Sequence, residues 1–326
     1  MSQTKHLGPW ASDPAPRAPR PVPRAPRILP DSPWRRGRLD RGAGAPELLF
    51  GRMHEDWTIE AAVAPPGGRI FCIASAGCTA MALSGLGFEV TAVDLNPVQV
   101  EYVRGRLAGA PQREGTAERM IGLARRAARL VGWSEIALRT FLMMEDPGEQ
   151  IQFWKRRLDR PLFRLGMSLA FRPAALRLFY DPPLTRILPR RFGAVFHDRL
   201  DRGFSIHPNR MNPYAWRTWL GCGPPGWDAP PARPEAITLA CADAAEYLEN
   251  EAPGSFDAFS LSNILDGPDE EYGRRLFAAV RHAAAPGAIM VLRSFREPVN
   301  RPDAAWAARD RSMLWGSVRV VEGERF

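Results

Sequence analysis

Two aspartates stand where strands are predicted to end, and the spacing around the first points to a ligand. Residues 68–97 contain an apolar run, a loop of small residues, a short helical pattern and a second apolar run that ends in Asp94. A strand, a glycine-containing turn, a helix and a strand ending on a carboxylate form the first half of a nucleotide-binding sheet. Asp94 follows Gly77 by 17 positions, near the roughly 20 expected for a carboxylate that binds ribose hydroxyls. We therefore predict an adenosine-containing ligand.

The loop between strand and helix, residues 74–79, indicates which adenosine compound fits. It holds one glycine, Gly77, where a dinucleotide loop has three. A pyrophosphate needs close backbone approach, which glycines permit, so a cofactor without phosphate tolerates the sparser loop. We predict S-adenosyl-L-methionine as co-substrate, bound by Ser75, Gly77, Asp94 and Asn96, with the backbone at Gly77 beside the methionine portion.

Further candidates follow the next two predicted strands. Asp243 ends the run 236–243, where an acid can bind the adenine amino group, and SLSNILD (260–266) follows the fourth strand. Ligands of open α/β sheets bind at this carboxyl edge. Asn263 and Asp266 could orient an acceptor or the amino-acid end of the cofactor. Capping of a helix or loop by these side chains is the open alternative.

A third candidate cluster lies just before the predicted core, at His54, Glu55 and Asp56. Two acids beside a histidine can hold the imidazole as a base for a hydroxyl proton, and Arg52 can bind a carboxylate. Neighbouring residues on a helix point in different directions, so not all of them can face one site. A structural role for His54 stays open.

These residues need a sheet to position them, and the chain carries the pattern of one. We predict an α/β fold with a Rossmann-like sheet of the class I S-adenosylmethionine-dependent transferase type and a long helical insertion. Its parts are a disordered arm rich in proline and arginine (1–46), the first half of the sheet domain (47–109), a basic helical insertion (110–230) and the second half (231–326).

Charge and composition bear on partners. The net charge of +8 comes from two basic segments, 1–41 and 151–210, on an otherwise acidic chain. Residues 151–180 mix arginines with aromatic and aliphatic side chains at helical spacing, which predicts an interfacial amphipathic helix on a membrane surface. The alternative is a helix that packs on its own sheet with a solvated basic face. No nucleic acid is expected, because no recognisable module accompanies the charge.

Cysteine spacing and hydropathy bear on the compartment. Cys72 and Cys241 lie in apolar runs, which predicts buried thiols in a reducing cytoplasm. The cysteines do not have the C-x-x-C spacing that would indicate a metal site. The uncharged stretch 70–88 is long enough to span a bilayer, but a strand, loop and helix explain it better. We expect no secretory leader, and predict a cytoplasmic protein that associates peripherally with a membrane.

Five segments carry a resemblance that covers about residues 45–300: HEDW (54–57), IASAGCTA (73–80), AVDLNPVQ (92–99), NPYAW (212–216) and SLSNILD (260–266). AVDLNP alone is only moderately specific, but its combination with the other segments is much more so. Together they resemble one family, the S-adenosylmethionine:diacylglycerol 3-amino-3-carboxypropyltransferases of betaine-lipid synthesis.

The resemblance implies transfer of the 3-amino-3-carboxypropyl group to the hydroxyl of a diacylglycerol-type lipid, with methylthioadenosine as the second product. Two alternatives stay open. One is an S-adenosylmethionine-dependent methyltransferase with another substrate, and the other is a non-catalytic membrane- or nucleic-acid-binding protein on a Rossmann scaffold. The predicted catalytic residues are His54, Glu55, Asp56, Asn263 and Asp266.

Overall fold

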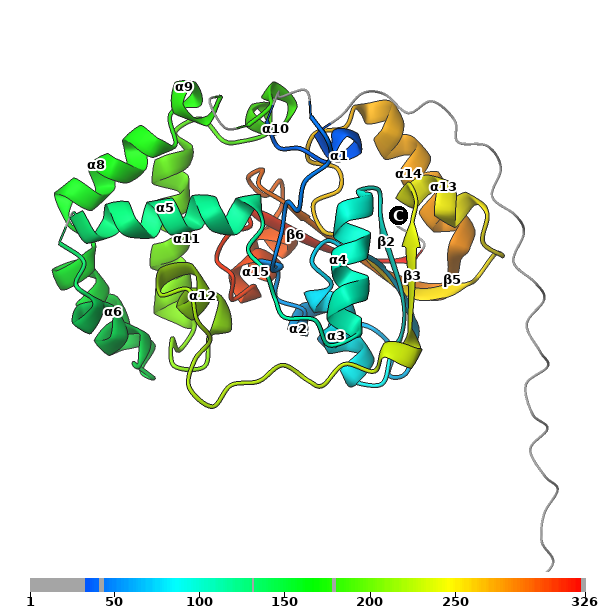
Figure 1. Cartoon of the computed structure of the whole chain (residues 1–326), viewed down its shortest axis with the longest axis horizontal. Coiled ribbons are helices and arrows are strands. Elements are labelled where there is room, and N and C mark those ends of the chain that lie inside the picture. The colour runs from blue at the N-terminus through cyan, green and yellow to red at the C-terminus, as the bar shows by residue number, and fades with distance from the viewer. Residues whose placement is uncertain (1–32, 41–43, 131, 178–179, 324–326) are drawn as a thin grey trace, which may run out of the picture.

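A six-stranded sheet with the order β3-β2-β1-β4-β5-β6 organises the chain (Figure 1). The computed structural model describes residues 33–40, 44–130, 132–177 and 180–323. All neighbouring strands are parallel except β6, which runs antiparallel to β5. The strands are β1 (Arg69–Ile73), β2 (Glu89–Asp94), β3 (Ile237–Cys241), β4 (Phe256–Ser260), β5 (Ala284–Ser294) and β6 (Ser317–Glu322). The prediction of a Rossmann-like α/β fold is confirmed at this level.

The strand order reverses between β1 and β4, and this sets the position of the site. The chain runs outward from β1 to β2 and β3, then returns to the other side of β1 for β4 and β5. In such sheets the crevice at the carboxyl ends of the strands, beside the reversal, is where ligands bind. The connecting helices are α3 (Cys78–Gly85), α4 (Pro97–Leu107), α13 (Ala244–Glu249) and α14 (Glu270–Ala283).

Both faces of the sheet are covered, because strand side chains alternate between them. From β1, Phe71 joins a core with α13 and α14 that contains Leu248 and Val280. Ile70 and Cys72 point to the opposite face, into a core with Leu83 of α3. Burial on both faces explains why β1 is apolar from Ile70 to Ile73.

The shorter elements complete the sheet region. Helix α2 (Thr58–Val63) precedes β1, and α15 (Arg301–Arg309) lies between β5 and β6. Ile59 of α2 packs with Val291 of β5 and with Trp315. A single 3-10 turn, η2 (Pro234–Ala236), leads into β3.

Helices fill the chain between α4 and β3, and Figure 1 shows most of them gathered on one side of the sheet. They share a core of large aromatic side chains, including Trp133, Phe141, Trp154 and Trp216. The helices are α5 (Thr116–Leu130), α6 (Glu135–Leu142), α7 (Pro147–Phe153), η1 (Trp154–Leu158), α8 (Pro161–Ala170), α9 (Pro173–Leu176), α10 (Pro182–Arg186), α11 (Phe192–Ile206) and α12 (Pro213–Trp219).

The prediction of one amphipathic helix over 151–180 is wrong in its geometry. The segment is broken into α7, η1, α8 and α9, with new helices beginning at Pro161 and Pro173. Proline lacks the N–H that a continuing helix needs, but it is tolerated in a first turn. Trp154 and Phe163 are buried in the aromatic core, so much of the apolar content packs internally.

Part of the predicted disordered arm is ordered. Helix α1 (Pro33–Arg36) packs near α10, and Arg36 forms an ion pair with Asp181. The backbone N–H of Asp181 also donates to the carbonyl of Leu39 at 2.7 Å. Residues 1–32 and 41–43 of that prediction lie outside the described residues.

Two further expectations can be compared with the structure. Cys72 is buried as predicted, but Cys241 is exposed, at the end of β3, an edge strand that pairs with β2 alone. Among the described residues, no helix combines the length and apolarity that crossing a bilayer requires.

Candidate functional site

A cavity of about 260 Å³ lies at the carboxyl ends of β1 to β4, beside the reversal in strand order. Its volume is just below the roughly 300–1,000 Å³ of typical ligand pockets. Predicted site residues that line it are Ser75, Asp94, Asn96, Asp243 and Asn263. The other lining residues are Trp34, Arg35, Leu49, Phe50, Ile73, Val93, Leu95, Gln99, Pro183, Ala242, Ala244, Ser262, Ile264, Gly267, Pro268, Asp269 and Tyr272.

Asp94 is the half-buried carboxylate at the end of β2, on the cavity wall. Its Oδ2 accepts from the backbone N–H of Ser75 and its Oδ1 from that of Asn96, both at 2.9 Å. Burial raises the pKa of Asp94 to about 6, although these backbone donors oppose the shift. A carboxylate oxygen has two lone-pair directions, so both oxygens keep capacity for ribose hydroxyls.

Two serines on the cavity wall hold unusual backbone conformations. Ser75 has φ of 44° and Ser262 has φ of 52°, in the left-handed region that costs non-glycine residues about 1 kcal/mol or more. Ser75 follows β1, and Ser262 follows β4. Strain held on both sides of the strand-order reversal is typical of a functional site.

Asn96 and Gln99 connect the cavity to the chain that precedes the sheet. Asn96 caps α4, accepting from the N–H of Val98 at 2.9 Å, and donates to the carbonyl of Glu47 at 2.8 Å. The Gln99 amide donates to the Ser75 carbonyl at 2.7 Å and accepts from the N–H of Leu49 at the same distance. Gln99 was not among the predicted site residues. It is a polar residue at a buried position of α4.

Asp243 combines the capping role with a place on the cavity wall. Its Oδ1 accepts from the N–H of Glu246, which caps α13, and its Oδ2 accepts from the Tyr272 hydroxyl at 2.9 Å. Leu95 and Ile264 add apolar surface to the same cavity. An acid among apolar walls can accept from the amino group of a flat ring, as predicted for adenine.

Asn263 faces the cavity, whereas Asp266 lies behind it. Asp266 accepts from the Ser294 hydroxyl at 2.7 Å and from the N–H of Phe295 at 3.0 Å, and it is almost fully buried. Burial raises its pKa, against these hydrogen bonds. Nδ2 of Asn263 lies 3.5 Å from Asp266. Asp266 therefore has the geometry of a residue that positions the 260–266 loop.

Gly77 has a structural explanation that does not involve a ligand. Its φ is 80°, and a Cβ built there would lie 2.9 Å from Cγ1 of Val103 in α4. The position therefore requires glycine so that α3 can begin close against α4. Gly77 lies next to the wall formed by Ser75 but is absent from the described cavity lining.

Asp56, predicted as catalytic, is bound to Arg311. Its carboxylate accepts from Nε of Arg311 at 2.5 Å and from Nη2 at 2.7 Å, and also from the Thr58 hydroxyl at 2.7 Å. Although burial raises the pKa of Asp56, these hydrogen bonds hold it below its usual value. The side chain is fully buried, so it anchors residues 47–57, which lead into α2 and are called the lead-in below.

Arg293 of β5 gathers the acids of this region into one buried network. Its guanidinium donates Nη2–H to Glu60 of α2 and to the Asp56 carbonyl, both at 3.0 Å, and Nε–H to Asp310 at 3.0 Å. Nη1 of Arg293 lies 3.8 Å from Oε2 of Glu55. One arginine therefore fixes the lead-in, α2 and the loop after α15 against the sheet.

Glu55 is the member of this network nearest the cavity. Ser262, which lines the cavity, donates its hydroxyl to Oε1 of Glu55. Oε2 of Glu55 is buried and has no hydrogen-bond partner among the described residues. Burial raises the pKa of Glu55 to about 7, which the nearby Arg293 opposes. A carboxyl that titrates near neutral pH suits proton transfer.

We expect Glu55→Gln to change the pH dependence of stability. The folded-state pKa of about 7 lies above the ordinary 4.5, so the native state binds the extra proton between these values and stability falls as pH rises through them. The variant lacks this loss. The unfolding free energy of the variant, relative to that of the parent, should therefore rise by up to about 3 kcal/mol between pH 5 and pH 8. Urea unfolding at several pH values measures it, and parallel pH profiles would contradict it.

His54 lies outside the cavity lining. Its Nε2 is buried, 3.6 Å from Oε1 of Glu118, with no hydrogen-bond partner among the described residues. Glu118 of α5 itself accepts from the N–H groups of Gly51 at 2.7 Å and Arg52 at 3.1 Å. The structure thus places His54 and Glu118 together where the lead-in meets the helical insertion.

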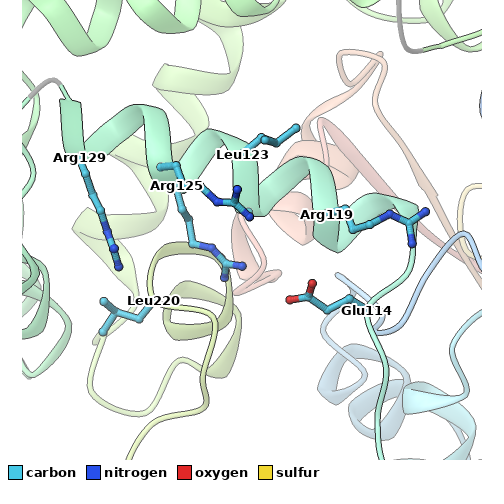
Figure 2. Close-up of a pocket in the computed structure, with 8 residues that line it drawn as sticks. Glu114, Arg119, Leu123, Arg125, Arg129 and Leu220 are labelled. Atoms are coloured by element: carbon cyan, nitrogen blue, oxygen red, sulfur yellow. The ribbon is translucent and has the colours of Figure 1, made fainter.

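A second cavity, of about 510 Å³, is an open groove along α5 (Figure 2). Figure 2 shows Arg125 and Arg129 reaching from α5 toward Leu220. Nη1 of Arg125 donates to the Arg217 carbonyl at 2.9 Å, which fixes the groove wall. The lining residues are Glu114, Arg119, Gly122, Leu123, Arg125, Arg126, Arg129 and Leu220.

One acidic cluster has the composition of a metal site, at Asp159, His197 and Asp201. Each acid is already paired with a cation: Arg164 donates Nε–H to Asp159 at 2.7 Å, and Lys155 donates to Asp201 at 3.1 Å. Nε2 of His197 lies 2.7 Å from Asp159. The cluster is therefore better explained as an ion-pair network that joins α8 to α11.

No family model, curated protein or solved structure matches the chain. Functional inference therefore rests on the cavity, the residues around it and the sequence resemblance.

Proposed function

We propose that the chain transfers the 3-amino-3-carboxypropyl group of S-adenosyl-L-methionine to the hydroxyl of a diacylglycerol-type lipid. The observation that carries the proposal is the position of Asp94, whose carboxylate lines a cavity at the strand-order reversal and holds the Ser75 loop. The same edge binds nucleotides in open α/β sheets. The mostly parallel six-stranded sheet is compatible with a Rossmann-like fold, the broader class to which the proposed transferase type belongs.

The hydrogen-bond acceptors on the cavity wall suit this co-substrate. Asp94 would accept from the ribose hydroxyls, and Asp243 from the adenine amino group, with Leu95 and Ile264 against the ring. The loop has no series of glycines for a pyrophosphate. The cavity volume of about 260 Å³ suits the nucleoside more than the whole cofactor.

In the proposed reaction, Glu55 and Ser262 remove the acceptor proton. Ser262 would take the hydroxyl proton of the lipid while passing its own proton to Glu55, to which it is already hydrogen-bonded. The bound sulfonium would supply the electrophilic γ-carbon and leave as methylthioadenosine. A C–O bond forms as the C–S bond breaks, and positioning of the two partners is the main demand.

The resemblance of HEDW, IASAGCTA and SLSNILD to the aminocarboxypropyltransferases favours this group over the methyl group. The cavity itself does not distinguish between the two transfers, because both would use the same nucleoside contacts. We expect the full chain, given S-adenosyl-L-methionine and detergent-dispersed diacylglycerol, to release methylthioadenosine and a homoserine-ether lipid. Chromatography of the nucleosides and mass spectrometry of the lipid measure this.

The product identifies the reaction class. S-Adenosylhomocysteine in place of methylthioadenosine would show a methyltransferase and overturn the proposed group. If calorimetry detects no cofactor binding, the second alternative, a non-catalytic membrane- or nucleic-acid-binding protein, is favoured. Asp94→Asn, which keeps the size of the side chain, is the matched control, and it should release neither nucleoside above background.

A further inference from the structure

The helix α8 presents an unpartnered apolar stripe to the surface. Leu162, Leu165 and Leu169 are 54%, 52% and 45% exposed. Their spacing of three and four residues places them on one face of the helix. The opposite face is packed, because Phe163 is buried in the aromatic core and Met167 packs against it. The stripe is therefore fixed in place and turned outward.

The exposed charges of segment 155–177, which contains the stripe, have one sign. Segment 155–177 contains a single acid, Asp159, and that acid is buried in an ion pair with Arg164. The exposed cations precede α8, lie on it and follow it: Lys155, Arg156, Arg157, Arg160, Arg164, Arg172 and Arg177. An apolar stripe bordered by exposed cations, with no exposed acid between them, matches an anionic surface with an apolar interior.

The basic surface extends from α8 toward α5. A Cβ built on Gly132, just after α5, would lie 3.4 Å from Nη1 of Arg160. Arg126 and Arg129 of α5 line the groove of Figure 2. Burial and the neighbouring charges of Arg52 and Arg129 lower the pKa of Arg125, which Glu114 opposes. Positive charge is thus concentrated along this side of the molecule.

We propose that α8 docks the protein on an anionic phospholipid bilayer, with the three leucines entering the acyl region and the arginines meeting phosphates. A bilayer accounts for both halves of the surface: leucine side chains gain from leaving water, and cations gain from an anionic leaflet. The bilayer as the source of a lipid substrate rests on the proposed function. The membrane contact itself depends only on α8 and the cations that flank it.

The test is flotation of the full chain with vesicles. Vesicles of phosphatidylcholine with an equal part of phosphatidylglycerol should carry the protein upward at low salt, and phosphatidylcholine alone should not. High salt should weaken the binding, because it screens exposed charges. Leu162→Ser/Leu165→Ser/Leu169→Ser should reduce the floated fraction roughly tenfold or more.

The matched control replaces three exposed apolar residues elsewhere, Leu86→Ser/Ile206→Ser/Val299→Ser, and should float like the parent. Arg160→Gln/Arg172→Gln/Arg177→Gln should remove the preference for anionic vesicles. Far-ultraviolet circular dichroism and urea unfolding show whether each variant is folded. If the leucine triple does not fold, the arginine triple alone decides.

Three outcomes would overturn the docking surface: no flotation of the parent, equal flotation of the two apolar triples, or self-association that only the α8 triple abolishes. The last would assign the stripe to a second copy of the chain. Because the nucleoside assay uses detergent-dispersed acceptor, it can succeed when flotation fails, and flotation can succeed without turnover. The two proposals therefore fail separately.

Discussion

Arg293→Met is expected to lower the free energy of unfolding by about 3–5 kcal/mol at neutral pH. The guanidinium is fully buried and is bound to Glu60, Asp310 and the Asp56 carbonyl. Methionine fills much of the same volume but donates no hydrogen bond. The variant therefore leaves several carboxylates in the interior with no cation, and removing one partner of a buried pair costs far more than removing both.

Urea unfolding at pH 7.5 and pH 5.5 measures this effect. The loss should be smaller at the lower pH, because protonation of carboxyls whose pKa burial raises, such as Glu55 and Asp310, relieves the unpaired charge. Arg139→Met is the matched control: Arg139 pairs with Glu135 on an exposed helix surface, where such pairs contribute about 0.3–0.5 kcal/mol. If the Arg293 variant were as stable as this control, the buried network would contribute little to the stability of the fold.

The Arg293 network also changes the interpretation of the HED segment. From the sequence, His54, Glu55 and Asp56 were all catalytic candidates, although not all of them were expected to face one site. In the structure, Asp56 pairs with Arg311 and His54 lies near Glu118, and only Glu55 contacts a cavity residue. The three residues separate because their partners lie 64, 207 and 255 positions away in the chain. Local spacing contains no information about such distant partners.

The predictions that depend on neighbouring residues along the chain were confirmed most fully. Asp94 and Asp243 lie at strand ends, because an apolar run followed by an acid marks the end of a buried parallel strand. Whether each strand is central or at an edge depends on sheet order. The exposed Cys241 on β3 is an example, since its apolar run resembles that of β1. Trp34 lies in a proline-rich context but lines the cavity and donates to the Asp266 carbonyl.

The helical insertion also shows that contacts between distant segments could not be predicted from the sequence. Its basic and aromatic composition predicted an amphipathic helix, and the prolines that divide it were visible in the sequence. Which aromatic residues would be internal was not visible, because Trp154 packs with Phe141 and Phe204 from different helices. The stripe on α8 is what remains exposed once that core has formed.

Asp94→Asn should weaken binding of S-adenosyl-L-methionine and of methylthioadenosine by at least about a hundredfold. Hydrogen bonds to a charged acceptor contribute about 1.5–3 kcal/mol each, and two ribose hydroxyls would bond to this carboxylate. Isothermal titration calorimetry measures the affinities. Because burial raises the pKa of Asp94 to about 6, affinity of the parent should also fall as pH drops through 6, and the variant should lack that dependence.

Asp94 also holds the Ser75 and Asn96 backbones, so a loss of affinity could arise from a displaced loop. An analogue of methylthioadenosine without the 2′ and 3′ hydroxyls separates these causes. If Asp94 binds the ribose, parent and variant should bind the analogue equally weakly. If Asp94 only orders the loop, the substitution should reduce the affinity for methylthioadenosine and for the analogue by the same factor. That second result would show that Asp94 does not contact the ligand, and Ser75 and Asp243 would remain as the candidate ligand-binding residues.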